Sequence, residues 1–252
     1  MKKTLVLLFL VTFVLFGFAQ DEIPLPNISI QITPPESPRD LTNTLEILLL
    51  LTILSLAPSI LILFTSFTRI IVVFSFLRNA LGTRQTPPNQ ILIGLALFLT
   101  FFIMQPVWND IYNNAVEPYL NSEIGYQELF SRSMDRLRTF MITELKTHHN
   151  EDNVYTLAEN AGEDINSIEE ASNSVLIPAF VIGELEIGFK MGILLYIPFI
   201  VMDMVVASIL LSLGMIMIPP VLVSLPFKIL LFVLVNGWDM VISSLINSFG
   251  GG

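Results

Sequence analysis

Four long apolar blocks, three of them interrupted by charged residues, constrain the fold of this chain more than any other feature. The blocks cover residues 45–64, 91–108, 187–213 and 227–249. Each is close to or above the ~20 residues that a helix needs to cross a bilayer. Only 13% of the chain is charged, which is about half the share found in soluble domains. We therefore predict an all-α membrane protein.

Charged groups within the blocks indicate that these helices do not cross lipid alone. The interruptions are Glu46, Lys190, Asp203, Lys228 and Asp239. Polar groups at such depth usually face protein or water rather than lipid. We therefore expect the helices to pack together in a bundle or an oligomer.

The N-terminus has the pattern of a secretory signal peptide that is removed. Lys2 and Lys3 precede an apolar stretch over residues 5–18, and Gly17 and Ala19 are the small residues expected before a cleavage site. An uncleaved signal anchor is the alternative. Residues 20–44 form a polar, proline-rich segment that we predict to be an extended periplasmic tail.

The distribution of charge in the loops predicts the orientation. Arg69, Arg78 and Arg84 lie between the first two blocks without an acidic neighbour, whereas residues 109–186 carry fifteen acidic and four basic residues. Short basic loops stay in the cytoplasm. We therefore expect the three arginines to form a cytoplasmic-side surface for partner subunits, and the acidic segment to be periplasmic.

These features together predict how the mature chain is organised. A first helical hairpin is expected over residues 45–107 and a second over residues 187–252, flanking a small helical domain over residues 108–186. Within that domain, helical spacing of apolar residues predicts one helix over residues 126–147 and a shorter one over residues 165–176.

The sequence contains no pattern that indicates catalysis or metal binding. It has no cysteine, glycine-rich phosphate loop or HExxH motif. His148 and His149 are adjacent, so they do not share a helix face and are poor joint metal ligands. Asp203 and Asp239 lack the Gly-x-Gly-Asp context of a membrane aspartyl protease. We expect neither an enzyme nor a bound cofactor.

Asp203 and Lys228 stand within apolar blocks on either side of a proline-containing turn. A lone carboxylate in an apolar bundle costs several kcal/mol, and pairing with an ammonium offsets part of that cost. We predict a buried ion pair between them, within one chain or between neighbours. Alternatively, Lys228 extends to the membrane interface and Asp203 faces water.

The turn between the last two blocks predicts a flexible apolar constriction. Gly214, Pro219 and Pro220 break the helix, and Met215, Ile216 and Met217 lie among them. Methionine is unbranched and repacks readily, and apolar constrictions can gate a channel by excluding water. Ordinary packing at a helix end is the alternative.

The run TSFTRIIVVFSFLRNALGTRQTPPNQILIGLALFLTFFIMQPV over residues 65–107 resembles the hallmark of the FliP family. The turn over residues 214–220 and the order of the blocks match the same family, and the resemblance extends over residues 41–249. It implies a core subunit of the type III export gate, five copies of which assemble with FliQ- and FliR-like subunits around a conduit for unfolded flagellar proteins.

The resemblance also implies roles for individual residues. Met215 and Met217 match gasket methionines, with Ile216 where many relatives have a third methionine, and Asp203 and Lys228 match a buried acid–base pair. The implied location is the inner membrane, in the flagellar basal body beside other export-gate membrane proteins, without nucleic acid. Two other functions remain open, a proton-coupled solute or ion transporter using Asp203 and an assembly factor of the flagellar base without a pore.

Overall fold

The computed structural model describes residues 48, 51–52, 55–56, 59–83, 86–215 and 217–249. The predicted signal peptide, the N-terminal tail, Arg84 and Ile216 lie outside the described residues, as does part of the first apolar block. The chain divides into two units, residues 1–52 and 53–252. Almost all described residues belong to the second unit, which is considered by itself below.

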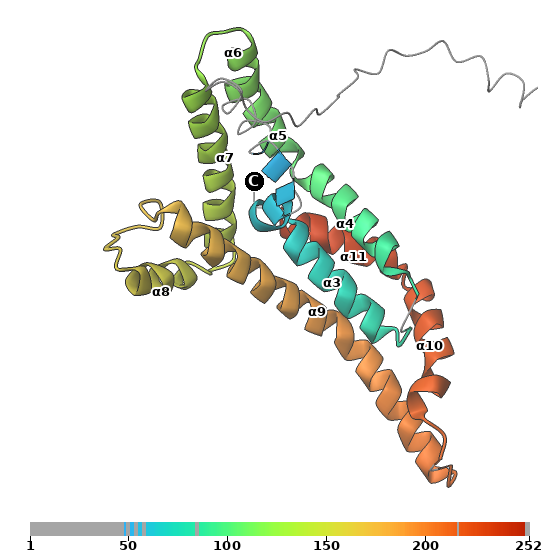
Figure 1. Ribbon diagram of the computed structural model, residues 1–252. Helices are drawn as coiled ribbons and strands as arrows, with labels where there is room; N and C mark the ends of the chain where they lie inside the picture. The colour runs from blue at the N-terminus through green and yellow to red at the C-terminus, as the bar shows by residue number, and fades with distance from the viewer. Residues whose placement is uncertain are drawn as a thin grey trace, which may run out of the picture. The chain divides into compact units, whose positions relative to one another are not determined.

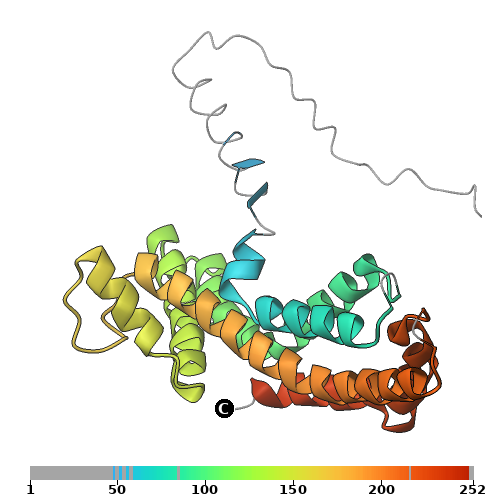
Figure 2. The same ribbon diagram turned by 90° about the horizontal axis from the view of Figure 1, so that it is seen from below.

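Helix α3 (Phe67–Ala80) lies at the centre of this unit, against α4 (Asn89–Ile103) and α9 (Asn173–Ser212) (Figures 1 and 2). Its apolar side chains recur every three or four residues, which places them on one face of a helix. Phe67, Ile70, Phe74 and Leu77 on this face are all buried. The arginine-containing loop of the sequence is therefore largely a packed helix.

The acidic segment is built from helices, and Figure 1 shows α7 and α8 beside the first part of α9. Its elements are α5 (Gln105–Ile111), the π-helix η1 (Tyr112–Val116), α6 (Glu117–Leu120), α7 (Tyr126–Thr147) and α8 (Asp152–Ala161). The helix predicted over residues 126–147 is confirmed by α7. Met141, Leu145 and Val154 form a core with Leu176 and Phe180, so the start of α9 completes this domain.

Helix α9 contradicts the short helix predicted over residues 165–176. It begins at Asn173, after an extended Ser172, and continues for 40 residues through Pro178 and Pro198. A proline removes one backbone hydrogen bond and crowds the preceding turn. Around Pro178, burial of Leu176 and Phe180 in the core holds the helix together despite that cost. One continuous helix thus joins the acidic domain to the third apolar block.

The second and fourth apolar blocks are bent, although their lengths predicted one crossing helix each. Between α4 and the helical stretch Gln105–Leu120 the axis turns by 55°, and between α10 (Pro220–Leu234) and α11 (Gly237–Ser248) it turns by 62°. Pro106 stands at the first bend. At the second, Asn236 adopts the left-handed conformation with φ of 50°, which ends α10 before α11 begins.

Length and composition make α9 the one helix of the described part that could cross a membrane by itself. If each bent pair counts as a single span, the described residues contain up to three spans. The described part of the chain contains helices and no strand.

Candidate functional site

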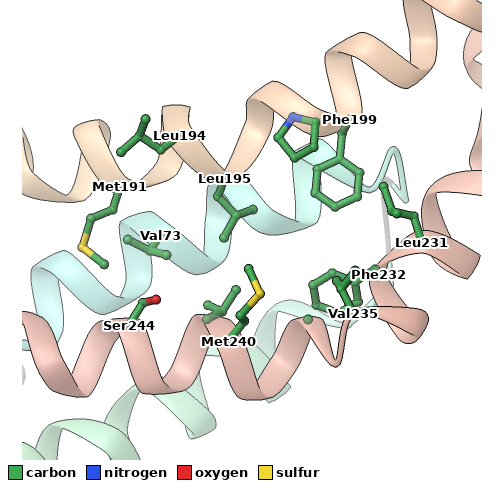
Figure 3. Close-up of a pocket in the computed structure, with 13 residues that line it drawn as sticks. Val73, Met191, Leu194, Leu195, Phe199, Leu231, Phe232, Val235, Met240 and Ser244 are labelled. Carbon is green, nitrogen blue, oxygen red and sulfur yellow. The ribbon is translucent and has the colours of Figure 1, made fainter.

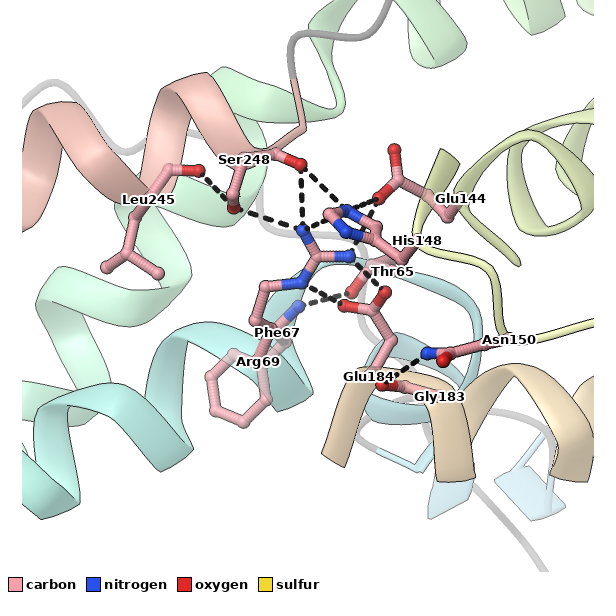
Figure 4. Close-up of polar contacts among 10 residues, drawn as sticks. All are labelled: Thr65, Phe67, Arg69, Glu144, His148, Asn150, Gly183, Glu184, Leu245 and Ser248. Atoms are coloured by element: carbon pink, nitrogen blue, oxygen red, sulfur yellow. Dashed lines mark hydrogen bonds and ion pairs between the residues drawn. The ribbon is translucent and has the colours of Figure 1, made fainter. Parts of the chain in front are cut away.

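A buried cluster of charged residues surrounds Arg69 near the start of α3 (Figure 4). The Arg69 guanidinium donates through Nε and Nη2 to the two oxygens of Glu184, at 3.0 and 2.5 Å, and through Nη2 to Glu144 Oε2 at 2.7 Å. Its Nη1 donates to the carbonyl oxygen and hydroxyl of Ser248, at 2.9 and 3.0 Å. One side chain therefore joins four helices, namely α3, α7, α9 and α11.

Packing completes the Arg69 cluster and excludes water from it. The Phe249 ring lies against the guanidinium, 3.6 Å from Cζ to the ring centroid, which allows a cation–π contact. Arg69 is 0% exposed, Glu184 1% and Glu144 4%. A guanidinium in the first helical turn opposes the helix dipole. The carboxylates of Glu144 and Glu184 offset the unfavourable energy of that position and the energy that the guanidinium loses when it leaves water.

His148, just after α7, lies at the edge of the cluster. Its Nε2 is 3.2 Å from Arg69 Nη1, 3.0 Å from the Ser248 carbonyl oxygen and 3.6 Å from Glu144 Oε2. Burial, helped by the positive charge of Arg69, lowers the pKa of His148. Burial raises the pKa of Glu144, although Arg69 opposes the shift. The site therefore disfavours an imidazolium and favours a protonated carboxyl.

This position of Arg69 shows that its assignment to an exposed cytoplasmic-side surface was wrong. A fully buried guanidinium paired with Glu144 and Glu184 offers no surface to a partner. Arg69 also contacts the acidic domain directly, so these two parts of the chain cannot face opposite sides of a membrane at this point. Arg78 remains half-buried and reaches Asn89 Oδ1 at 3.4 Å.

The structure brings Asp203 of α9 and Lys228 of α10 together. Lys228 Nζ donates to Asp203 Oδ2 at 2.6 Å and to the Ala80 carbonyl oxygen at 3.1 Å, where α3 ends. The Ser224 hydroxyl donates to Asp203 Oδ1. Lys228 is 2% exposed and the Asp203 side chain 26%. Lysine at a helix C-terminus also interacts favourably with the helix dipole, so this contact ties α3, α9 and α10 together.

The turn between α9 and α10 has the backbone geometry of a Schellman motif. Gly214 is left-handed, with φ of 76°. The N–H groups of Met215 and Gly214 donate to the carbonyl oxygens of Leu210 and Leu211, at 2.9 and 3.0 Å. Pro219 caps and Pro220 begins α10.

The two described methionines of the turn lie at its surface. The side chain of Met217 is 96% exposed, and Met215 is also exposed. The turn itself is the end of α9 farthest from α7 and α8 in Figure 1.

An apolar cavity of about 470 Å³ lies between α9 and the bend from α10 to α11 (Figure 3). Its lining includes Met191, Phe199, Phe232 and Met240, and Ser244 contributes a hydroxyl. Such a lining offers packing surface rather than groups for proton transfer. Among the described residues, no cluster of three or more His, Asp or Glu side chains could hold a metal ion.

Sequence reasoning missed most of the residues around Arg69, and it missed Ser224. Glu144 and Glu184 appeared only as part of an acidic segment, while His148 was considered only as a metal ligand. The available signal was a charged residue inside the apolar helical stripe of residues 67–77. Such a position requires a buried partner, although the stripe alone does not say which carboxylates supply it.

Comparison with known proteins connects these features to one family. The FliP family profile matches residues 50–245. Flagellar biosynthetic protein FliP of Aquifex aeolicus (strain VF5) is 46% identical over 99% of this chain and 100% of its own length. The protein of the same name from Bacillus subtilis (strain 168) is 45% identical over 88% of this chain and 100% of its own length.

A solved structure, described as the periplasmic domain of FliP, is 65% identical to this chain. It covers 26% of this chain and 98% of its own length, with a TM-score of 0.26. The profile match over most of the sequence and the full-length relatives lead to one conclusion: this chain belongs to the FliP family.

Proposed function

We propose that this chain is a core, channel-forming subunit of the flagellar type III protein export gate. In this proposal five copies assemble with FliQ- and FliR-like subunits into a gated conduit for unfolded flagellar proteins. Membership of the FliP family supports it, because the relatives are named flagellar biosynthetic proteins. The observation that supports the gating role is the turn between the apolar helices α9 and α10, where Met215 and Met217 are exposed.

The outer surfaces of α9 and α10 support a place in a membrane assembly. Leu194, Met204, Leu222 and Leu234 are among the large apolar side chains that stay exposed along these helices. Exposed apolar surface of this extent marks contact with lipid or with other subunits. The charges of Asp203 and Lys228 pair with each other within the chain. The outer surfaces of α9 and α10, which neighbouring subunits would cover, therefore stay apolar.

In the proposed arrangement, two helical hairpins flank a periplasmic acidic domain in the inner membrane of the flagellar basal body, after removal of the signal peptide. No bond chemistry is assigned to the chain. The contacts of Asp203 favour this reading over a proton-coupled transporter. A carboxylate that is held by Lys228 and Ser224 acts as a structural anchor between α9 and α10.

The conduit is tested by cross-linking from the methionine turn. The chain has no cysteine, so Met217→Cys creates a single reactive thiol at an exposed position. In assembled export complexes, we expect this thiol to cross-link to an export substrate that is stalled in transit. Phe130→Cys, at an exposed position on α7, is the control and should give no such product. Absence of substrate adducts from position 217 in intact complexes would support an assembly factor without a pore.

The seal is tested separately by ion leakage. Met215→Ala combined with Met217→Ala removes two flexible apolar side chains from the turn, which should let water and small ions pass. We expect slowed growth under salt stress and faster ion flux in cells that express the assembled complex. Met204→Ala, at an exposed methionine within α9 rather than in the turn, should leave the flux unchanged. A tight membrane with both turn methionines replaced would contradict the gasket.

A further inference from the structure

The cluster around Arg69 contains more negative than positive charge. One guanidinium faces two carboxylates, those of Glu144 and Glu184, and all three side chains are buried. With a neutral His148, the cluster carries one excess negative charge. An uncompensated charge in a buried site is expensive, and ionisable groups in such sites change protonation instead.

The surrounding charged groups do not remove this imbalance. On α9, Lys190 pairs with Glu186 at 2.9 Å, and both side chains are largely exposed. Lys146 of α7 pairs with Glu169 at the surface. The charge of Lys190 acts on the cluster only by lowering the pKa of His148, less than burial and Arg69 do. The groups of α11 that contact Arg69 are the carbonyl oxygen and the hydroxyl of Ser248, and both are uncharged.

We propose that Arg69, Glu144, Glu184 and His148 form a proton-binding latch that fastens the end of α11 to α3, α7 and α9. One proton, held by the pair of carboxyl groups, brings the cluster to neutrality. His148 is not its main holder, because the imidazole Nε2 lies 3.2 Å from the Arg69 guanidinium, where a second positive charge is repelled. This latch belongs to the single chain and does not depend on the proposed export role.

Loss of the proton should weaken the attachment of α11. Arg69 binds the carboxylates with Nε and Nη2 and binds Ser248 with Nη1. A second full negative charge between α7 and α9 repels the first and draws water into the site, which opens the contact between the guanidinium and Ser248. The sign follows from the raised pKa of Glu144. Its contribution to stability is fully present below pH 4.5, the ordinary value, and is lost as the pH rises through the folded-state pKa.

The test measures unfolding of the purified full chain as a function of pH. The wild-type Tm should fall as the pH rises from 4.5 to neutral and above, because the folded-state pKa of Glu144 is raised. Glu144→Gln keeps an oxygen that accepts from Arg69 but removes the excess charge, so its Tm should change much less over this range. Glu128→Gln is the matched control, since Glu128 lies exposed on the same helix and pairs with Arg132. This control should follow the wild type.

Two further variants locate the proton, and hydrogen exchange tests the latch. Glu184→Gln should flatten the pH profile of the Tm as Glu144→Gln does. The test can therefore still be made if one of these two variants does not fold. His148→Gln should keep the wild-type slope.

Backbone amides at the end of α11 should exchange faster at high pH in the wild type, beyond the intrinsic base catalysis, but not in Glu144→Gln. Parallel wild-type and Glu144→Gln profiles, or flattening by His148→Gln instead, would overturn the proposal.

Discussion

Replacing Arg69 with methionine should destabilise this protein through charge rather than through packing. Methionine is long, flexible and apolar, so it can fill much of the space that the arginine stem occupies. It removes the guanidinium that neutralises Glu144 and Glu184, which are 4% and 1% exposed. It also removes the donor to the carbonyl oxygen and hydroxyl of Ser248.

The size of the effect follows from the cost of protonating carboxylates that have lost their partner. Moving a carboxyl with an ordinary pKa of 4.5 to its neutral form at pH 7 costs about 3.4 kcal/mol. If the wild-type cluster already holds one proton, only the second protonation is a new cost. Loss of the hydrogen bonds to Ser248 adds about 1 kcal/mol. The total of about 4–5 kcal/mol agrees with the range of about 3–5 kcal/mol for breaking a buried ion pair.

The assay is chemical unfolding of the purified chain, followed by tryptophan fluorescence at two pH values. At pH 7, Arg69→Met should lose about 4–5 kcal/mol of unfolding free energy. Near pH 4.5 the loss should be much smaller, because unfolded carboxyl groups then also carry protons. Adding Glu144→Gln and Glu184→Gln to Arg69→Met should recover much of the loss at pH 7. An equal loss at both pH values, with no recovery in the triple variant, would show that packing and not charge explains the effect.

Four further variants have expected outcomes in the same unfolding assay. Gly237→Ala places a Cβ atom 2.2 Å from the Phe232 ring, so it should cost about 1–3 kcal/mol. Gly94→Ala, inside α4, meets nothing within 4 Å and should instead stabilise the chain by about 0.5–1 kcal/mol, because alanine favours the helix. Asp203→Asn leaves a lysine that is 2% exposed without its counter-charge and should cost about 3–5 kcal/mol. Adding Lys228→Met to Asp203→Asn should reduce that loss, and a double variant no more stable than Asp203→Asn would argue against the ion pair.

Helices with a regular apolar period could be predicted closely from the sequence. The helix expected over residues 126–147 is α7, and the apolar residues on the buried face of α3 recur with the same period. Both depend on side chains three or four residues apart, which is local information. The helix predicted over residues 165–176 is wrong, because the local sequence favours a helix end before Pro178, which removes a backbone hydrogen bond. Long-range packing of Leu176 and Phe180 decided otherwise.

Pairing of charges could be predicted only where few partners were available. Asp203 and Lys228 are isolated charges in neighbouring apolar blocks, so each is the natural partner of the other, and the structure places them 2.6 Å apart. For Arg69, the segment over residues 109–186 contains fifteen acidic residues, and the sequence does not indicate which of them are its partners. Its partners, Glu144 and Glu184, lie 75 and 115 residues away along the chain.

The sequence by itself determined that this chain is helical, rich in long apolar segments and related to the FliP family, because composition and helical period are properties of neighbouring residues. Only the tertiary structure decided where its charges lie. Arg69 carries the same charge in a surface loop and in a buried core, and the difference arises from the folding of α7, α9 and α11 around it. Burial and the identity of an ion-pair partner depend on distant segments meeting in space, which no local pattern encodes.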